Sequence, residues 1–199
     1  MTGKIHSVIG VASCTLVMRP RDFNELLFCA AVGTIGGLLP DIDIRNSEIR
    51  QDMKELTICA GIAGVGLLAY NLIHGINPLQ FLRGMNSVQM IAIVALICTI
   101  LIGFLSEHRN FTHSIEFALI VSLCVGILFS NTLVAIGMLL GILSHDLADT
   151  LNKKKVLLSC ILNIRYCAGI CTADSKMAKS IGIIAGAVVV LYCMLTGII

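Results

Sequence analysis

The chain has little of the charge that a soluble protein carries on its surface. Charged residues make up 13% of its 199 positions and hydrophobic residues 57%, against roughly 25% charged and 45–50% apolar residues in an average soluble domain. Tryptophan is absent and tyrosine occurs three times, so the aromatic side chains on which nucleic-acid bases stack are scarce. This composition excludes a soluble fold and indicates an integral membrane protein, and we expect no nucleic acid as a partner.

The nine cysteines show no pattern that is typical of disulfides or of a metal site. Most occur singly inside apolar runs, where cysteine behaves as a small hydrophobic residue. Cys160, Cys167 and Cys171 form the one cluster, but their spacing matches no familiar zinc-binding pattern. We therefore predict no disulfide framework and no thiolate metal site.

Long apolar segments fill most of the chain, at residues 5–18, 23–39, 56–73, 88–105, 114–129, 132–147 and 181–199. Because a membrane-spanning helix needs about 20 residues, they predict an all-α polytopic membrane bundle of about seven helices, with six as the alternative, in a single domain of residues 1–199. The first apolar run is too short for a cleaved signal peptide, so His6 is expected to remain. Glycines four residues apart suit close helix packing or reflect the abundance of glycine in membrane helices. These pairs are Gly33 with Gly37, Gly137 with Gly141, and Gly182 with Gly186.

The basic residues predict the orientation of the bundle. If seven spans alternate in direction, eleven of the fourteen Lys and Arg residues fall on one face, and the positive-inside rule makes that face cytoplasmic. The same alternation gathers seven ionisable side chains at the cytoplasmic ends of their segments. They are His6, Asp41, Asp43, His108, His113, His145 and Asp149. Because such groups are costly at membrane depth and are rarely kept there without a partner or function, we predict a site at this rim.

The residue types at this rim indicate a metal site. Imidazoles and carboxylates without thiolates are the ligands that zinc, manganese or iron take in proteins. His145 and Asp149 are four residues apart, which places them on one face of a helix. Any one of these residues taken alone is more often a helix cap or a headgroup contact, so the prediction rests on their joint occurrence.

Two further groups extend the predicted site. Asp41 and Asp43 follow Pro40 at the end of a span, where at least one carboxylate can turn back toward the bundle. We place His108 in a loop and His113 at the start of the next span. Glu116, one helical turn beyond His113, is an optional ligand or a partner of a ligand.

Four sequence blocks carry a resemblance to a known family. His6, Leu38–Asp43 (LLPDID), His108–Ser114 (HRNFTHS) and Leu143–Asp149 (LSHDLAD) resemble, in order and spacing over about residues 1–160, the motifs of the YdjM-like family of inner-membrane proteins classed as metal-dependent hydrolases. That family is more distantly similar to zinc-dependent phospholipase C and related single-strand nucleases, whose helical bundles bind a small zinc cluster and cleave phosphodiesters. The resemblance implies a multi-pass protein of the inner membrane, and the distribution of basic residues predicts that its site faces the cytosol.

The chain departs from the wider group after Asp149. That group adds a later histidine and glutamate, whereas no histidine follows Asp149 here, so the resemblance implies one or two metal ions rather than three. The sequence from Thr150 to Lys155 also differs from the family pattern, which implies that substrate recognition by this segment is not shared. Zinc is the preferred ion, with manganese and iron as alternatives.

Together these features predict a membrane-embedded hydrolase that cleaves a phosphoester or phosphodiester through metal-activated water. Its substrate is expected to be a lipid or isoprenoid phosphate, with a soluble nucleotide left open. Asp43 or Asp146 is the expected general base, and Arg109 is expected to bind a phosphate oxygen through its planar guanidinium group or to contact a headgroup. The predicted metal ligands are the seven rim residues His6, Asp41, Asp43, His108, His113, His145 and Asp149.

Two other classes of function compete with this prediction. A carrier or channel for a divalent metal would use similar residues, but transport sites usually lie near the midplane of the bilayer. A non-catalytic membrane protein would use the metal only to tie helix ends together, in a closed coordination shell. The basic residues Lys153–Lys155, Arg165, Lys176 and Lys179 either attract anionic headgroups of the lipid bilayer or only set the topology. No oligomeric state follows from the sequence.

Overall fold

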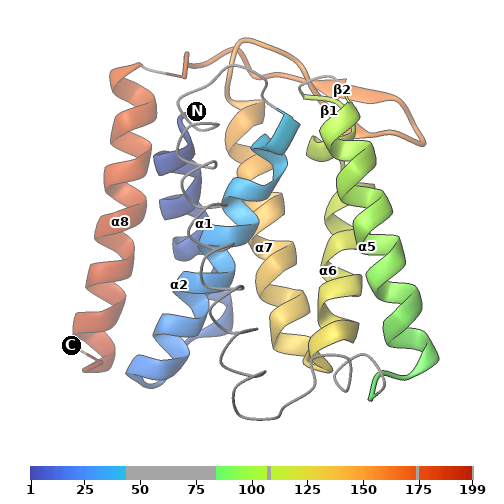
Figure 1. The fold of residues 1–199 in the computed structure, drawn as a ribbon. Helices are drawn as coiled ribbons and strands as arrows, with labels where there is room; N and C mark the ends of the chain where they lie inside the picture. Colours follow the sequence, from blue (N-terminus) through green and yellow to red (C-terminus); the bar gives the residue numbers. More distant parts are fainter. Residues whose placement is uncertain (44–83, 107–108, 174, 199) are drawn as a thin grey trace, which may run out of the picture.

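The protein is a helical bundle in a computed structural model that describes residues 1–43, 84–106, 109–173 and 175–198. Its long helices stand side by side (Figure 1). In the described ranges they are α1 (Gly3–Met18), α2 (Phe23–Leu38), α5 (Ser87–Leu105), α6 (Ile115–Phe129), α7 (Thr132–Thr150) and α8 (Lys176–Thr196). Short 3-10 helices η1 (Leu39–Asp43) and η2 (Phe111–His113) precede or follow them. The all-α membrane bundle is confirmed, while the predicted span 56–73 lies outside the described residues.

Several helices match the dimensions of a bilayer. Within the described residues, four are long and apolar enough to cross a membrane, and α1 and α6 are shorter apolar helices. Large apolar side chains point away from the bundle, with Leu105 75% and Leu195 79% exposed, as expected where lipid replaces water. The segment predicted to end at residue 147 continues as α7 to Thr150, and this extra turn carries Asp149.

Polar residues between the apolar runs determine where the helices begin. The side chain of Asp22 accepts a hydrogen bond from the backbone N–H of Glu25 at the start of α2. Ser114 caps α6 in the same way, and Asn131 caps α7. Because such side chains satisfy N–H groups that a helix leaves without partners, each helix starts at a defined residue. Ser114 thereby fixes the chain directly after His113.

Glycines allow α1, α2 and α7 to approach one another closely. A Cβ atom on Gly37 of α2 would lie 2.6 Å from the carbonyl oxygen of His6 in α1. A Cβ atom on Gly141 of α7 would lie 2.8 Å from the Cα atom of Gly36. Neither distance leaves room for a side chain, so the close packing predicted for these helices is confirmed at both positions.

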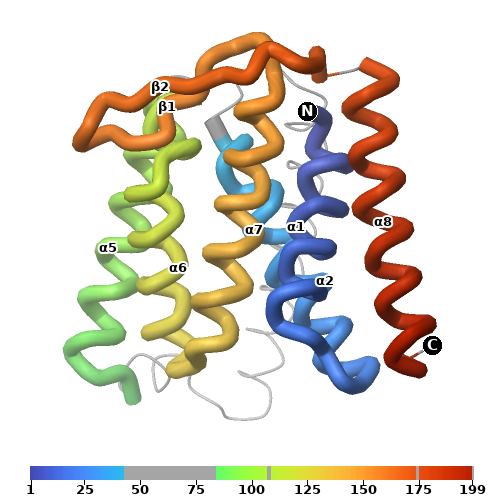
Figure 2. Tube along the Cα trace, turned by 180° about the vertical axis from the view of Figure 1, so that it is seen from behind, coloured from blue at the N-terminus to red at the C-terminus, as the bar shows by residue number. Residues whose placement is uncertain are grey.

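A β-hairpin covers one end of the bundle. It consists of β1 (Val156–Ser159) and β2 (Ile164–Tyr166), which pair antiparallel. It lies at the same end as the start of α1 and the ends of α2 and α7 (Figures 1 and 2). Val156 of β1 is fully buried whereas all of β2 is exposed, so only the first strand packs against the bundle.

Candidate metal centre

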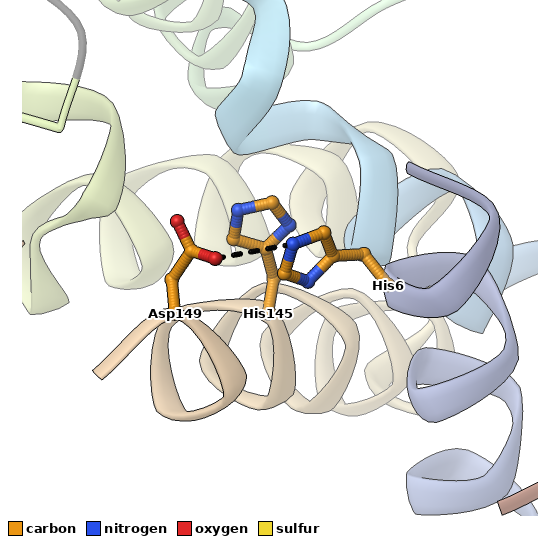
Figure 3. Close-up of side chains that lie close together, drawn as sticks. All are labelled: His6, His145 and Asp149. Atoms are coloured by element: carbon orange, nitrogen blue, oxygen red, sulfur yellow. Dashed lines mark ion pairs between the residues drawn. The ribbon is translucent and has the colours of Figure 1, made fainter. Parts of the chain in front are cut away.

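The structure brings five of the predicted residues together at the hairpin end of the bundle. They come from four segments: His6 from α1, Asp41 from η1, His113 from η2, and His145 and Asp149 from α7. The three imidazoles are 0% exposed, Asp149 is 2% exposed and Asp41 5%. Figure 3 shows His6 of α1 pointing toward His145 and Asp149, which share one face of α7.

The nitrogen and oxygen atoms of these side chains lie within ligand distance of one another. His6 Nε2 is 3.2 Å from Asp149 Oδ1, and His113 Nε2 is 3.7 Å from Asp149 Oδ2. His145 Nε2 is 3.3 Å from His113 Nε2 and 3.6 Å from Asp41 Oδ1. They form two groups of three, His6, His145 and Asp149 in one and Asp41, His113 and His145 in the other, with ligand atoms within 4.8 Å in each group. His145 belongs to both.

Backbone and hydroxyl groups orient two of the imidazoles. His145 Nδ1 lies 2.7 Å from the carbonyl oxygen of Gly37. Because a carbonyl only accepts, we assign the proton of His145 to Nδ1, which leaves the lone pair on Nε2 facing the other ligands. Thr112 Oγ1 lies 3.0 Å from His113 Nδ1 and restrains the second ring in a similar way. A partner on the far ring nitrogen is typical of histidines that bind metals.

The arrangement fits a small divalent cation. Zinc with nitrogen ligands at about 2.0–2.1 Å in a tetrahedron holds neighbouring ligand atoms about 3.3 Å apart. The closest approaches among these ligand atoms are 3.2–3.7 Å. Imidazole nitrogens with carboxylate oxygens are the donor set of zinc, manganese and iron. The described residues can therefore hold such an ion with small movements of their side chains.

Asp149 is held by further contacts. Asn152 Nδ2 donates to its Oδ1 over 2.7 Å, the α-amino group of Met1 lies 2.7 Å from the same oxygen, and Arg109 Nη2 lies 3.2 Å from Oδ2. Arg109 also donates from Nη1 to the carbonyl oxygen of Lys154 over 3.1 Å. The backbone of Arg109 has a φ of 67°, a conformation that residues other than glycine rarely adopt and that often occurs at functional sites.

Sequence reasoning missed several of these partners, among them Asn152 and the backbone carbonyl of Gly37. Asn152 follows Asp149 by three residues, a spacing that brings side chains together at the end of a helix and that could have indicated the contact. The carbonyl of Gly37 carries no side-chain signal in the sequence. Its role comes from the close approach of α2 to α7, which depends on the tertiary packing.

The other predicted residues are not among these five. Asp146 is 4% exposed, and neither carboxylate oxygen has a hydrogen-bond partner among the described residues, but it belongs to neither ligand group. Glu116, expected as an optional ligand, instead accepts hydrogen bonds from the hairpin, including one of 2.6 Å from Ser159 Oγ. Its oxygens therefore face the hairpin rather than the candidate metal centre. His108 and the side chain of Asp43 lie outside the described residues.

A cationic cavity adjoins Asp149. It has a volume of about 230 Å³. It is lined by Arg109, Asn152, Lys153, Lys154, Thr172 and Ala173. Arg109 and Asn152 contact both this cavity and the carboxylate of Asp149. The cavity is therefore linked to the candidate metal centre through two shared residues, and three of its lining residues are basic.

Comparison with known proteins gives a family and one uncharacterized relative. The model of the family described as YdjM inner membrane protein matches residues 1–199. The chain is also similar to the uncharacterized protein YvsG of Bacillus subtilis (strain 168), with 26% identity over 168 residues that cover 83% of this chain and 78% of that protein. No solved structure matches the chain significantly. The resemblance seen in the four sequence blocks is confirmed, and the distant similarity to phospholipase C stays a prediction.

Proposed function

The chain belongs to the YdjM inner membrane protein family, and we propose that it is a metal-dependent hydrolase of phosphoester or phosphodiester bonds. The proposed substrate is a lipid or isoprenoid phosphate, reached from the cytoplasmic side of the membrane. The supporting observation is that three imidazoles and two carboxylates converge at the rim of the bundle. Zinc is the preferred ion, with manganese or iron as alternatives.

The five converging residues would hold the cation. His145 contributes to both ligand groups, with His6 and Asp149 in one and Asp41 and His113 in the other. When bound, a divalent cation activates water and polarises a phosphoryl oxygen. Asp146 is the candidate general base. Its side chain is buried, and both carboxylate oxygens lack hydrogen-bond partners among the described residues. Asp43 and His108 stay as the further predicted members of the site.

The cavity beside Asp149 supports an anionic substrate. Arg109, Lys153 and Lys154 line it, and a guanidinium group with two ammonium groups favours a phosphate over a neutral ligand. Arg109 is also 3.2 Å from Asp149 Oδ2. A phosphate bound there would share Arg109 with the carboxylate and would lie next to the cation.

A structural metal is the second candidate, and the burial of the ligands favours it. The side chains of His6, His113 and His145 are 0% exposed, which suits a closed coordination shell. Such an ion would tie the ends of α1, α2, α6 and α7 together. The cationic cavity distinguishes the two candidates because a purely structural ion does not need it.

Metal content of the purified protein tests the proposal first. We would compare wild type, His145→Ala and Asp41→Ala by elemental mass spectrometry after growth with sufficient metal. Glu25→Gln is the matched control, because this exposed carboxylate lies in the first turn of α2, away from the centre. We expect stoichiometric zinc, manganese or iron in wild type and Glu25→Gln and a marked loss in the other two variants. Wild-type protein without a stoichiometric transition metal would contradict the proposal.

Activity measurements separate hydrolysis from the other functions. We would measure phosphate release from lipid phosphates, isoprenoid phosphates and phosphodiesters, with and without a chelator. Hydrolysis that is lost on chelation and restored by the metal supports the enzyme. Bound metal without hydrolysis of any substrate supports the structural role, and metal uptake into sealed vesicles supports a carrier.

A further inference from the structure

The hairpin exposes large apolar side chains at the end of the bundle. Ile161 in its turn is 83% exposed, the highest value among the large hydrophobic residues described, and the neighbouring Leu162 is 70% exposed. On β2, Ile164 is 46% and Tyr166 53% exposed. Outside a membrane such a patch would be a liability, since contiguous exposed apolar surface usually marks an interaction site.

Basic residues flank this apolar turn. Lys153, Lys154 and Lys155 lead into β1, and Arg165 lies between the two exposed apolar residues of β2. All four are exposed, and residues 151–173 contain no Asp or Glu. The hairpin and the segment leading into it therefore combine an apolar turn with charged residues that are all basic. Lipid headgroups with negative charge complement both features, because the interface offers apolar chains beside anionic groups.

The bundle holds the hairpin in a defined position. Glu116 at the start of α6 accepts three hydrogen bonds from the turn: 2.6 Å from Ser159 Oγ, 3.1 Å from Cys160 N and 3.2 Å from Ile161 N. Leu157 N donates to the carbonyl oxygen of Arg109 over 3.1 Å. Glu116 and the backbone of Arg109 therefore hold the hairpin and its apolar turn in place.

The hairpin extends beyond the outer edge of the bundle. It extends outward over the ends of α5 and α6 at the edge of the bundle (Figures 1 and 2). The sides of α5 carry exposed apolar residues, such as Ile91 at 68% and Leu105 at 75%. Because α5 is long and apolar enough to span the membrane, lipid packed against these exposed side chains would place its headgroups near the end of α5 that the hairpin overlies.

We propose that the hairpin Val156–Tyr166 docks on the membrane that the bundle spans. Ile161 and Leu162 enter the boundary between headgroups and acyl chains, while Lys155 and Arg165 bind anionic headgroups. This proposal does not depend on the metal or on hydrolysis. It does explain why the side chains of Ile161 and Leu162 are exposed and why the charged residues of the hairpin and of the segment leading into it are basic.

The absence of tryptophan from the chain provides a direct test. Leu162→Trp introduces a single tryptophan at an exposed position, so little repacking is required. We would reconstitute this variant into vesicles of equal parts phosphatidylcholine and phosphatidylglycerol. We expect blue-shifted emission, quenching by lipids brominated near the headgroup more than by lipids brominated near the chain end, and little quenching by iodide. Ile161→Trp is the second reporter.

Two controls calibrate this measurement. Ile97→Trp lies near the middle of α5 at a position that is 53% exposed, and it should be quenched most by the deeply brominated lipid. Adding Lys155→Gln and Arg165→Gln to Leu162→Trp should weaken the quenching by shallow bromines in anionic vesicles and change little in pure phosphatidylcholine. These two basic residues do not line the cavity beside Asp149.

Three outcomes would overturn the proposal. Red-shifted emission with strong iodide quenching at both reporter positions would place the turn in water. Blue-shifted emission that neither iodide nor brominated lipid quenches would place it against protein, either a second copy or another part of the chain. Quenching that the charge-removing substitutions leave unchanged in anionic vesicles would rule out recognition of anionic headgroups.

Discussion

Replacing Gly37 by alanine perturbs the contact that brings the histidines of the centre together. The added Cβ atom would lie 2.6 Å from the carbonyl oxygen of His6, so α1 and α2 must move apart by several tenths of an ångström. The carbonyl of Gly37 also accepts the hydrogen bond from His145 Nδ1. One methyl group therefore disturbs the positions of two predicted ligands, although Gly37 is itself no ligand.

The size of the effect follows from the backbone contact. Because the obstacle is a carbonyl group rather than a flexible side chain, the strain cannot be relieved by a rotamer change, and overpacking of this kind costs about 1–3 kcal/mol. At about 2–4 °C per kcal/mol for a chain of this length, we expect the melting temperature of Gly37→Ala to fall by roughly 2–12 °C. Displaced ligand supports typically weaken metal binding by about 10- to 100-fold.

Gly186→Ala is the matched control. Its Cβ atom would lie 3.7 Å from Val8 Cγ1, an ordinary contact, so neither melting temperature nor metal content should change. Both variants would be measured in detergent by thermal unfolding and by titration with a metal buffer. The reasoning is wrong if Gly37→Ala unfolds at the same temperature and binds metal as tightly as Gly186→Ala.

Three further substitutions test individual contacts. Ser114→Ala removes the cap of α6 and should cost about 0.5–2 kcal/mol; an unchanged melting temperature would show that the cap is dispensable. Asn152→Ala removes the 2.7 Å hydrogen bond to Asp149 and should weaken metal binding by about 10- to 100-fold, seen by competition with a chelator; unaltered affinity would exclude this support. Glu116→Gln weakens the anchor of the turn and should speed amide hydrogen exchange at Cys160 and Ile161 but not in α7; equal protection would contradict the anchoring role.

The sequence could predict that the ligands lie at the same end of the bundle, because this depends only on the directions of the helices. Asp41 ends one helix and His113 precedes another, while Asp149 lies in the last turn of α7. Alternating directions bring such positions to the same end of a bundle without any knowledge of packing. The spacing of His145 and Asp149 then fixed their common face.

The hairpin could not be predicted from the sequence in the same way. Its strands are short, and β2 has no buried face, so the sequence shows no clear alternation of apolar and polar residues. Its position depends on Glu116 and on the backbone of Arg109, which are distant in sequence. Contacts of this kind follow from the assembled fold, and the same is true of the carbonyl of Gly37 at the metal centre.

His145 belongs to both ligand groups but can coordinate only one ion. Its Nδ1 is committed to the carbonyl of Gly37, so its single free lone pair on Nε2 can coordinate one cation. One ion would therefore draw its other ligands from both groups, whereas with two ions His145 would serve only one of them. A second ion would then need another ligand, and Asp146 is a buried carboxylate on the same helix whose oxygens have no hydrogen-bond partner among the described residues. A measured stoichiometry of two that falls to one in Asp146→Asn would assign Asp146 as that ligand, while a stoichiometry of one in wild type would leave it free to act as a base.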